Sequence, residues 1–332
     1  MRKNLNKSSQ TVLKRRQAEP ELKLRRILVP LDLSGLSRQA LTCAVPLARS
    51  YKAKISLVHV VQPPIVVKAF PDGVSHIPIS SNDLMNSIRV ELDDLAKQLL
   101  PGDLLDRTIV RAGNAAYEVV LAANRLNTDL IVLSTNGRSG LKRAVLGSTA
   151  ERIVRHAKCP VLTVRRRPSR QAVQASFHKG SAYARRLPWR RILVPLDFSL
   201  TSLRALPVAV QLAKQCGARL LLLNVVEPSP YPTGMEGVTL IVPDSELAQY
   251  AGTELPRIAR RFVPKSVRVT PLIDHGRAAN AIVDTAEEQG VDLIVLSTHG
   301  HTGLDRLLLG STAEHVVRHA KCPVLVVRKH RD

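Results

Sequence analysis

The sequence predicts two tandem α/β domains, each built on an open parallel sheet with helices on both faces. The first observation is a duplication: LSTNGRSGLKRAVLGSTAERIVRHAKCPVLTVR (133–165) recurs as LSTHGHTGLDRLLLGSTAEHVVRHAKCPVLVVR (296–328) at an offset of 163. The second is that RILVPLDLS (26–34) recurs as RILVPLDFS (191–199) at an offset of 165. The third is that apolar runs alternate with helical patterns, which is typical of βαβ units. Two copies of this length are two domains, each able to bury its own core.

The first half of each copy starts with a strand. RILVPL (26–31) is an apolar run without polar alternation, which indicates a strand that is buried on both faces of its sheet. Ser34 or Ser37 can cap the next helix, because apolar residues recur at helical spacing to about Ser50. The elements predicted next are a strand at 55–61, a long Pro- and Ser-rich loop at 62–81, and an amphipathic helix at 82–100 that Pro101-Gly102 ends.

The second half of each copy continues the alternation of strands and helices. The elements predicted there are a strand at 107–112, a Gly113-Asn114 turn into a helix that runs through Leu126, a strand at 129–134, a Gly-rich loop, a helix at 148–156 and a strand at 160–165. Residues 191–328 repeat the same order.

Positive charge is concentrated outside the two copies. The net charge is +22, but residues 1–26 contribute +7 and residues 165–191 contribute +9. We therefore expect a basic mobile tail, two nearly balanced domains and a basic linker. The boundaries are 1–24 for the tail, 25–165 for the first domain, 166–190 for the linker and 191–332 for the second domain.

Composition favours a globular cytoplasmic protein. No apolar run reaches the roughly 18 residues that a membrane-spanning helix needs. The basic N-terminal residues are not followed by the apolar segment of a secretory signal. The four cysteines show neither a CxxC motif nor a Cys/His ligand cluster, which fits a reducing compartment.

Each copy places Gly-rich turns where an apolar strand ends and the next helix begins. In the first copy Ser134-Thr-Asn-Gly137 follows a strand, and Gly147-Ser148-Thr149 starts a helix. The second copy repeats these turns as Ser297-Thr-His-Gly300 and Gly310-Ser311-Thr312. Ligands of open α/β sheets bind at this edge, and a helix N-terminus offers unbonded N–H groups with partial positive charge. The two turns could therefore close on one polyphosphate.

A capping interaction explains part of this pattern without any ligand. Ser148…Glu151 and Ser311…Glu314 fit the S-x-x-E capping box, and each Glu adds negative charge near the supposed phosphate. The spacing to the upstream glycine favours a ligand. Both interpretations stay open at this point.

Two aspartates end the first strands of the copies. Asp32 and Asp197 could each accept a hydrogen bond from a ribose hydroxyl, or each could be a turn aspartate that caps the following helix. Pro30 and Pro195 lie within these predicted strands and suggest a strand end or a bulge there.

The repeated residues do not indicate catalysis. His59 is matched by Asn224 in the second copy, so it is not a shared base. His156 and His319 fall in the last turn of a predicted helix, where they complement the helix dipole. Because no nucleophile–base pair or metal cluster recurs, we assign no catalytic and no metal-ligating residue.

The VPxD motif, the LGSTAE loop and the HAKCPVLxVR ending together resemble the universal stress protein family. The resemblance covers residues 25–165 and 190–328. It implies a five-stranded parallel sheet of order 3-2-1-4-5 in each domain, in a Rossmann-like fold similar to the adenine nucleotide alpha hydrolases. It also implies that the two domains pair within the chain through their last strands, with a homodimer as a further possibility.

The resemblance implies ATP, with Mg²⁺, as the ligand. The family pattern Gly-x2-Gly-x9-Gly-[Ser/Thr] is matched at three of four positions in each copy, with Ser134 and Ser297 in place of the first glycine. The nucleotide-binding residues that it implies are Pro30, Leu31, Asp32, Val60, Leu133, Ser134, Gly137, Gly147, Ser148 and Thr149 in the first domain, and Pro195, Leu196, Asp197, Val225, Leu296, Ser297, Gly300, Gly310, Ser311 and Thr312 in the second.

We therefore expect a cytoplasmic stress-response protein that binds ATP and acts as a nucleotide-dependent regulatory module, with at most slow hydrolysis. One alternative is a protein–protein scaffold of the same fold with empty sites, because Ser replaces Gly in both motifs. Another is attachment to nucleic acid or an anionic membrane through the basic tail and linker, where Tyr183 and Trp189 could stack or insert.

Overall fold

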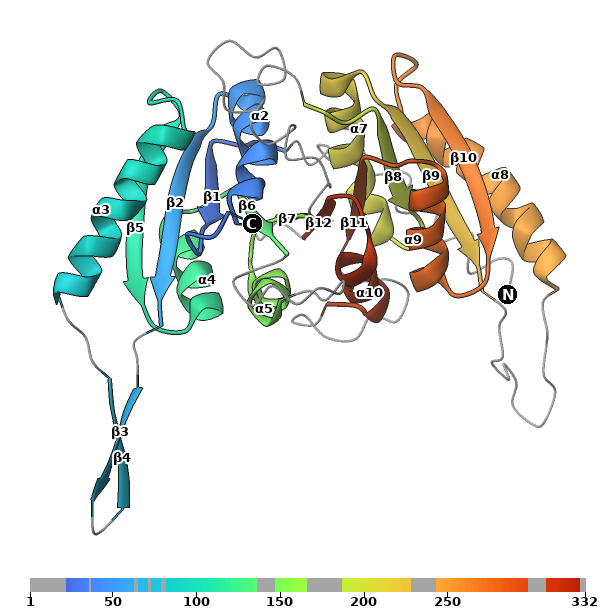
Figure 1. Cartoon of the computed structure of the whole chain (residues 1–332). Helices are drawn as coiled ribbons and strands as arrows, with labels where there is room; N and C mark the ends of the chain where they lie inside the picture. The colour runs from blue at the N-terminus through green and yellow to red at the C-terminus, as the bar shows by residue number, and fades with distance from the viewer. Residues whose placement is uncertain are drawn as a thin grey trace. The chain divides into compact units, whose positions relative to one another are not determined.

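A computed structural model describes residues 22–35, 37–62, 65–70, 73–78, 82–135, 147–165, 187–227, 243–297 and 309–328. The chain divides into two compact units. The first-repeat unit comprises Lys23–Pro188 together with Val317–Asp332, and the second-repeat unit comprises Met1–Leu22 together with Trp189–Val316. Each unit is an α/β structure (Figure 1).

The sheet of the first-repeat unit has the strand order β5-β2-β1-β6-β7-β12. All neighbours pair in parallel except β12, which is antiparallel to β7. The first five strands therefore confirm the predicted order 3-2-1-4-5, and the last strand of the second repeat adds a sixth. The strands are β1 (Arg26–Pro30), β2 (Lys54–Val61), β5 (Leu105–Ala112), β6 (Leu130–Ser134), β7 (Val161–Val164) and β12 (Val324–Val327).

The central strands are covered on both faces. Successive residues of β1, β6 and β7 are buried, although they point alternately to the two sides of the sheet. The start of β1 is fixed by Asp129, whose Oδ2 accepts hydrogen bonds from the backbone N–H groups of Arg25 and Arg26, both at 2.8 Å. Asp292 repeats this arrangement at Arg190 and Arg191, at 2.9 and 3.1 Å.

The helices of the first-repeat unit begin close to their predicted positions. After β1 the chain forms a 3₁₀ turn η1 (Ser37–Ala40) and then α2 (Leu41–Tyr51). α4 begins after Asn114, whose side chain accepts from the N–H of Tyr117 at 3.1 Å, as expected for an N-cap. The remaining bounds are α3 (Asn82–Leu99), α4 (Ala115–Arg125) and α5 (Ser148–His156).

The sheet of the second-repeat unit has the order β10-β9-β8-β11, and its neighbouring strands pair in parallel wherever a register is defined. At the start of α9 the position equivalent to Asn114 is Arg277, which makes no capping bond. Glu227 compensates, because its carboxylate accepts from the N–H of Ala278 at 2.6 Å. The elements are β8 (Arg191–Pro195), η3 (Ser202–Arg204), α7 (Ala205–Cys216), β9 (Arg219–Val226), α8 (Asp244–Phe262), β10 (Val269–His275), α9 (Ala278–Glu288), β11 (Leu293–Ser297) and α10 (Ser311–His319).

The prediction of a loop over 62–81 is wrong. Two strands, β3 (Ile65–Phe70) and β4 (Gly73–Pro78), pair there as an antiparallel hairpin (Figure 1). The β-branched run at 65–67 and the Pro-Asp-Gly sequence at 71–73 are the signals that the Pro- and Ser-rich composition obscured.

Residues just ahead of each first strand belong to the core. Leu22 and Leu24 are buried, as are their counterparts Leu187 and Trp189. The side chain of Gln211 in α7 binds Leu22 twice, accepting from its N–H at 2.6 Å and donating to its carbonyl at 3.1 Å. Because Trp189 is only 2% exposed, the expectation that it stacks on a base or inserts into a membrane is wrong. Tyr183 lies outside the described residues.

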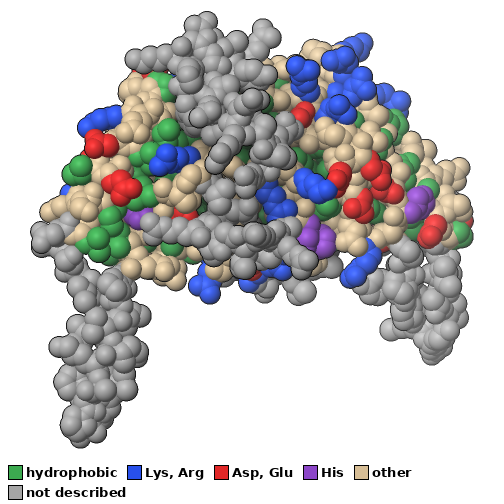
Figure 2. All heavy atoms as spheres, viewed as in Figure 1, with side chains coloured by type: hydrophobic (Ala, Val, Ile, Leu, Met, Phe, Trp, Pro, Cys, Tyr) green, Lys and Arg blue, Asp and Glu red, His purple; other side chains and the backbone are tan. Residues whose placement is uncertain are grey.

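In the view of Figure 2, described Lys and Arg side chains gather along the upper right edge, with a group of Asp and Glu side chains below them. Among the described residues, none of the helices has the length and apolar character that crossing a membrane requires.

Candidate functional site

The candidate site of the first-repeat unit lies where the strand order reverses. β1 pairs with β2 on one side and with β6 on the other, and the chain leaves β1 and β6 in opposite directions along the sheet. Such a switch point is where open α/β sheets bind ligands, beyond the carboxyl ends of the strands. Asp32 and Ser134 stand at these two strand ends, and both are half-buried. In the second-repeat unit Asp197 and Ser297 stand at the equivalent ends of β8 and β11.

The turn after β1 is held by hydrogen bonds among its own residues. Oδ1 of Asp32 accepts from the N–H of Ser34 at 3.0 Å and from its hydroxyl at 2.5 Å. The Ser34 hydroxyl oxygen in turn accepts from the N–H of Ser37 at 3.2 Å. Between them Leu33 has φ +63°, in the left-handed region that non-glycine residues rarely adopt. Asp32 therefore holds the turn, as one interpretation predicted, but it does not cap α2, whose N-cap is Ala40. Pro30 is the last residue of β1, as its position suggested.

The second repeat builds the same turn. Oδ1 of Asp197 accepts from the N–H of Ser199 at 2.9 Å, and Ser199 accepts from the N–H of Ser202 at 3.0 Å. Phe198 has φ +61°. Because two chemically different side chains adopt this backbone, the strain belongs to the turn and not to either residue.

A buried side chain of the second strand anchors this turn in each repeat. Nδ1–H of His59 donates to the carbonyl oxygen of Leu31 at 2.7 Å. The amide Nδ2–H of Asn224 donates to the carbonyl oxygen of Leu196, also at 2.7 Å. The sequence pattern missed this shared role, because the two residue types differ and only their common ability to donate connects them.

The start of α5 packs against the end of β6. The N–H of Gly147 donates to the carbonyl of Thr135 at 3.0 Å, and a Cβ on Gly147 would lie 3.3 Å from the same oxygen. Glycine suits this position because a side chain would crowd the Thr135 carbonyl, which would have to move by a few tenths of an ångström. α5 therefore begins at the same sheet edge as the Asp32 turn.

The proposed capping boxes are wrong. Gly147 is the N-cap of α5, and no side chain makes a capping bond there. Ser148 is the first helical residue, so its hydroxyl points away from the position that an N-cap side chain occupies. α10 likewise begins at Ser311, where the carbonyl of Gly310 accepts from the N–H of Glu314 at 2.9 Å. Ser148 and Ser311 are both exposed.

The other predicted site residues fall at the same two edges. Leu31, Leu133, Leu196 and Leu296 are buried. Pro30, Val60, Pro195 and Val225 are half-buried near the ends of their strands, Thr149 is exposed, and Thr312 is half-buried in the first turn of α10. Gly137 and Gly300 lie outside the described residues.

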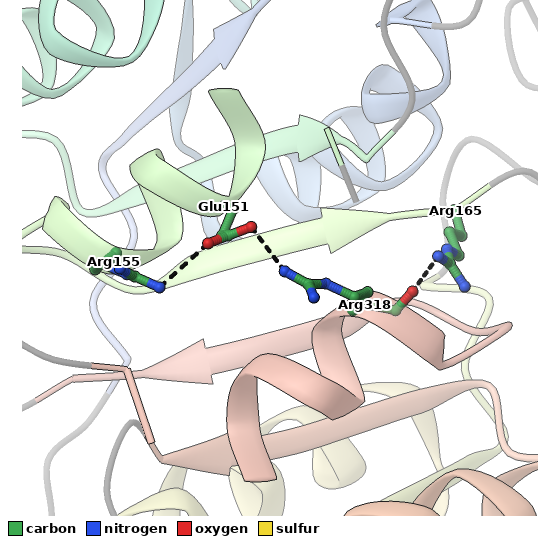
Figure 3. A network of polar contacts seen from close by, with 4 residues as sticks. All are labelled: Glu151, Arg155, Arg165 and Arg318. Carbon is green, nitrogen blue, oxygen red and sulfur yellow. Dashed lines mark hydrogen bonds and ion pairs between the residues drawn. The ribbon is translucent and has the colours of Figure 1, made fainter. Parts of the chain in front are cut away.

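Glu151, in the first turn of α5, joins a network of guanidinium groups in the first-repeat unit (Figure 3). Its Oε1 lies 3.1 Å from a nitrogen of Arg155, and its Oε2 lies 2.9 Å from a nitrogen of Arg318. Arg318 comes from α10, whereas Arg155 is one turn further along α5. The carboxylate is about three-quarters buried, so both ion pairs are partly shielded from water.

Two more arginines bind the carboxyl ends of these helices. Arg165, after β7, donates to the carbonyls of Arg318 and, at 3.0 Å, of Ala320. Its counterpart Arg328, after β12, donates to the carbonyls of Val154 and, at 2.6 Å, of Arg155. Burial lowers the pKa of both guanidinium groups, which nonetheless stay charged at neutral pH. Cations at helix C-termini complement the helix dipole.

No group of three or more His, Cys, Asp or Glu side chains in the described ranges could hold a metal ion. The four cysteines are unpaired by disulfides. Burial raises the pKa of Cys159 and of Cys216 to about 12, which leaves both thiols protonated at neutral pH.

Comparison with known proteins identifies relatives of both repeats. A sequence model described as the universal stress protein family matches residues 23–165 and 188–328. A universal stress protein of Methanocaldococcus jannaschii is 40% identical over 144 residues, covering 42% of this chain and 83% of the relative. One from Mycolicibacterium smegmatis is 26% identical over 315 residues, covering 91% and 96%. The crystal structure of a universal stress protein from Archaeoglobus fulgidus superposes with a TM-score of 0.61 at 19% identity, covering 93% and 97%, which supports the fold.

Proposed function

Because the chain belongs to the universal stress protein family, we propose that each repeat binds ATP at the carboxyl edge of its sheet. In this proposal nucleotide occupancy regulates how the protein binds its partners, and the chain acts by binding. We assign no catalytic residue.

One observation carries the proposal: both repeats build the same arrangement at the switch point, although the buried residue that anchors it differs, His59 in one and Asn224 in the other. In both, the first strand is followed by an Asp whose next residue, Leu33 or Phe198, has a positive φ. In both, the neighbouring strand, β6 or β11, ends at a Ser. In both, the turn is anchored by a buried donor, His59 or Asn224. Strained backbone retained at such an edge is typical of a binding site.

In this proposal the residues at this edge take the roles that the family resemblance implies for an adenine nucleotide. Pro30 to Asp32 and Val60 would border the adenosine, with Leu133 beside the ribose. The first turn of α5 would hold the phosphates, because its N–H groups point outward and Gly147 allows the main chain close approach. Pro195 to Asp197, Val225, Leu296 and the first turn of α10 would do the same in the second repeat.

Magnesium would reach this site on the nucleotide. The described residues offer no carboxylate cluster for a resident ion, whereas Mg²⁺ is usually held by phosphate oxygens and one or two carboxylates. The bound ATP would bring a triphosphate to the helix start, where partial positive charge favours it.

Ser134 and Ser297 would place a hydroxyl where the family pattern has glycine. Each is half-buried at the end of its strand, so the hydroxyl can donate to a phosphate or ribose oxygen. We propose that these serines contribute a donor and do not block the site.

Ser148 and Ser311 allow a direct test. Ser148→Asp with Ser311→Asp places a carboxylate in the first turn of both helices, which stabilises a helix but repels a bound phosphate. Titration calorimetry with Mg·ATP should show binding to the parent protein and at least ~10-fold weaker binding to the double variant. Ser148→Ala with Ser311→Ala is the matched control and should retain most of the affinity. A hundredfold excess of ATP over Kd should also raise the free energy of unfolding of the parent by about 2.7 kcal/mol.

Two results would favour the scaffold alternative. The first is no binding at millimolar Mg·ATP together with no nucleotide in mass spectra of protein purified without added ligand. The second is ATP binding that appears only after Ser134→Gly and Ser297→Gly. Cytoplasmic location is part of the proposal and rests on the four cysteines that form no disulfide.

A further inference from the structure

We infer that Arg318, a residue of the second repeat, tunes the charge at the nucleotide site of the first repeat through Glu151. The inference rests on the proposed ATP site at the start of α5. It makes the affinity of one repeat depend on a side chain that the other repeat supplies.

The first step is the position of Glu151. It lies in the opening turn of α5, one turn from Gly147, whose carbonyl accepts the N–H of Glu151 at 3.0 Å. A carboxylate in this place stabilises an empty helix but opposes a phosphate at the same N-terminus. Anion binding at α5 therefore requires the charge of Glu151 to be offset.

The second step is the source of the offsetting charge. Arg155 and Arg318 bind the two oxygens of the Glu151 carboxylate separately, at 3.1 and 2.9 Å (Figure 3). Arg155 belongs to α5 itself and balances the one negative charge. With Arg318 added, the three side chains Glu151, Arg155 and Arg318 carry a net positive charge. The net attraction for an anion at the start of α5 therefore comes from a residue of α10.

The third step is that the backbone of Arg318 is fixed by a hydrogen bond to its carbonyl oxygen. Arg165 donates to the carbonyl of Arg318, and Arg328 donates to carbonyls at the far end of α5. Both ends of α5 thus meet residues of the second repeat. Because a guanidinium nitrogen of Arg318 lies 2.9 Å from the Glu151 carboxylate, we treat Arg318 as a positioning group that acts through Glu151 and not as a direct ligand of the phosphates.

The experiment uses the full chain with the second site blocked by Ser311→Asp, so that Mg·ATP titration reports the first site. Arg318→Gln should weaken binding about 3- to 10-fold at low salt, and less at 0.5 M salt, because one charge near the phosphates is lost. Arg318→Lys keeps the charge and should stay within about twofold of the parent.

The double variant Glu151→Gln with Arg318→Gln separates charge from structure. It removes both partners and restores the parent net charge, so affinity should return to within about twofold of the parent. If Arg318 served only to stabilise the local structure, the double variant would bind Mg·ATP as weakly as Arg318→Gln does, and the inference would be wrong. Thermal unfolding of each variant checks that the fold is kept.

Two controls distinguish the possible failures. Arg257→Gln removes an equivalent exposed ion pair with Glu254 in α8, 2.9 Å long, and should leave affinity unchanged. Lys97→Gln, which removes an exposed ion pair with Asp94 in α3, is the second control and should change affinity by less than about twofold. If the affinity for ATP is the same with and without Arg318→Gln, this inference is wrong but the proposed function stands. No ATP binding by the parent would overturn the proposed function and this inference together.

Discussion

Nδ1 of His59 lies 2.7 Å from the carbonyl oxygen of Leu31, and the same hydrogen bond is made by Asn224 in the second repeat. A carbonyl oxygen only accepts, so the proton of the His59 ring is on Nδ1. The bond connects the second strand to the turn that carries Asp32. It also explains how one copy can use histidine and the other asparagine without a change in backbone.

The first prediction concerns this anchor. His59→Asn should change the free energy of unfolding by less than about 1 kcal/mol, because the amide can donate in the same way. His59→Leu keeps the size but leaves the buried Leu31 carbonyl without its donor, and should cost about 1–3 kcal/mol. Urea unfolding at pH 7 measures both. Equal losses for Asn and Leu would mean that the hydrogen bond is not what the position requires.

The second prediction concerns the starts of the first strands. Asp129→Ala and Asp292→Ala each remove an acceptor for two successive N–H groups and should lower the free energy of unfolding by about 1–2 kcal/mol. Asp129→Asn keeps an oxygen acceptor and should cost less. Asp284→Ala, an exposed position in α9, is the control and should stay within about 0.5 kcal/mol. A loss at Asp284 as large as at Asp129 would contradict the assignment.

The third prediction concerns stability in acid. Burial acts to raise the pKa of Asp106, but hydrogen bonds from Arg107 at 2.8 Å and Ser56 at 3.0 Å, with the charges of Arg107 and Lys54, bring it below the ordinary 3.8. The folded state therefore binds fewer protons than the unfolded state near this pKa. The stabilisation is present above about pH 4 and is lost as the pH falls through that range.

Asp106→Asn should consequently reduce the difference in unfolding free energy between pH 7 and pH 3. Asp94→Asn, which alters a largely exposed carboxylate, should leave that difference close to the parent value. Chemical unfolding at the two pH values gives the comparison. An acid dependence that is identical in the parent and in Asp106→Asn would show that this carboxylate does not contribute.

The fourth prediction concerns the thiols. Burial raises the pKa of Cys159 and of Cys216 from 9.0 to about 12, so at pH 8 each has about 1,000-fold less thiolate than an ordinary thiol. Cys43 and Cys322 are buried. All four should react slowly with Ellman's reagent in the native protein and quickly in guanidinium chloride. If a cysteine of the folded protein reacted within seconds, its thiol would be accessible to the reagent, which would contradict the prediction.

The alternation of parallel strands and helices followed from local sequence, whereas the strand order 3-2-1-4-5 came from the resemblance to the universal stress protein family. Apolar runs such as RILVPL separated by helical patterns require parallel βαβ units, and the duplicated segments fixed which strand of each copy carries Asp32 or Asp197. Asn114 was also recognisable as a helix start, because an N-cap depends on residues within one turn.

The remaining features depend on residues far apart in the chain. Arg165 and Arg328 bind helix ends more than 150 positions away, and no periodicity reports such a contact. The role of Gln211 at Leu22 spans 189 positions. The capping boxes were mistaken for a different reason: Gly147 takes the N-cap position because its backbone donates to Thr135, and this moves Ser148 into the helix.

The pairing of β12 with β7 has a consequence for biosynthesis. Thr163 of β7 meets Val324 of β12, 161 residues later, so the edge of the first sheet at β7 is completed only after those residues have been synthesised. At ordinary translation rates β7 must wait roughly 10–30 s for its neighbour. During that time an apolar strand edge stays open to other nascent chains. A chain that ended before β12 would leave the backbone edge of β7 unpaired, and such an edge can pair with strands of other chains.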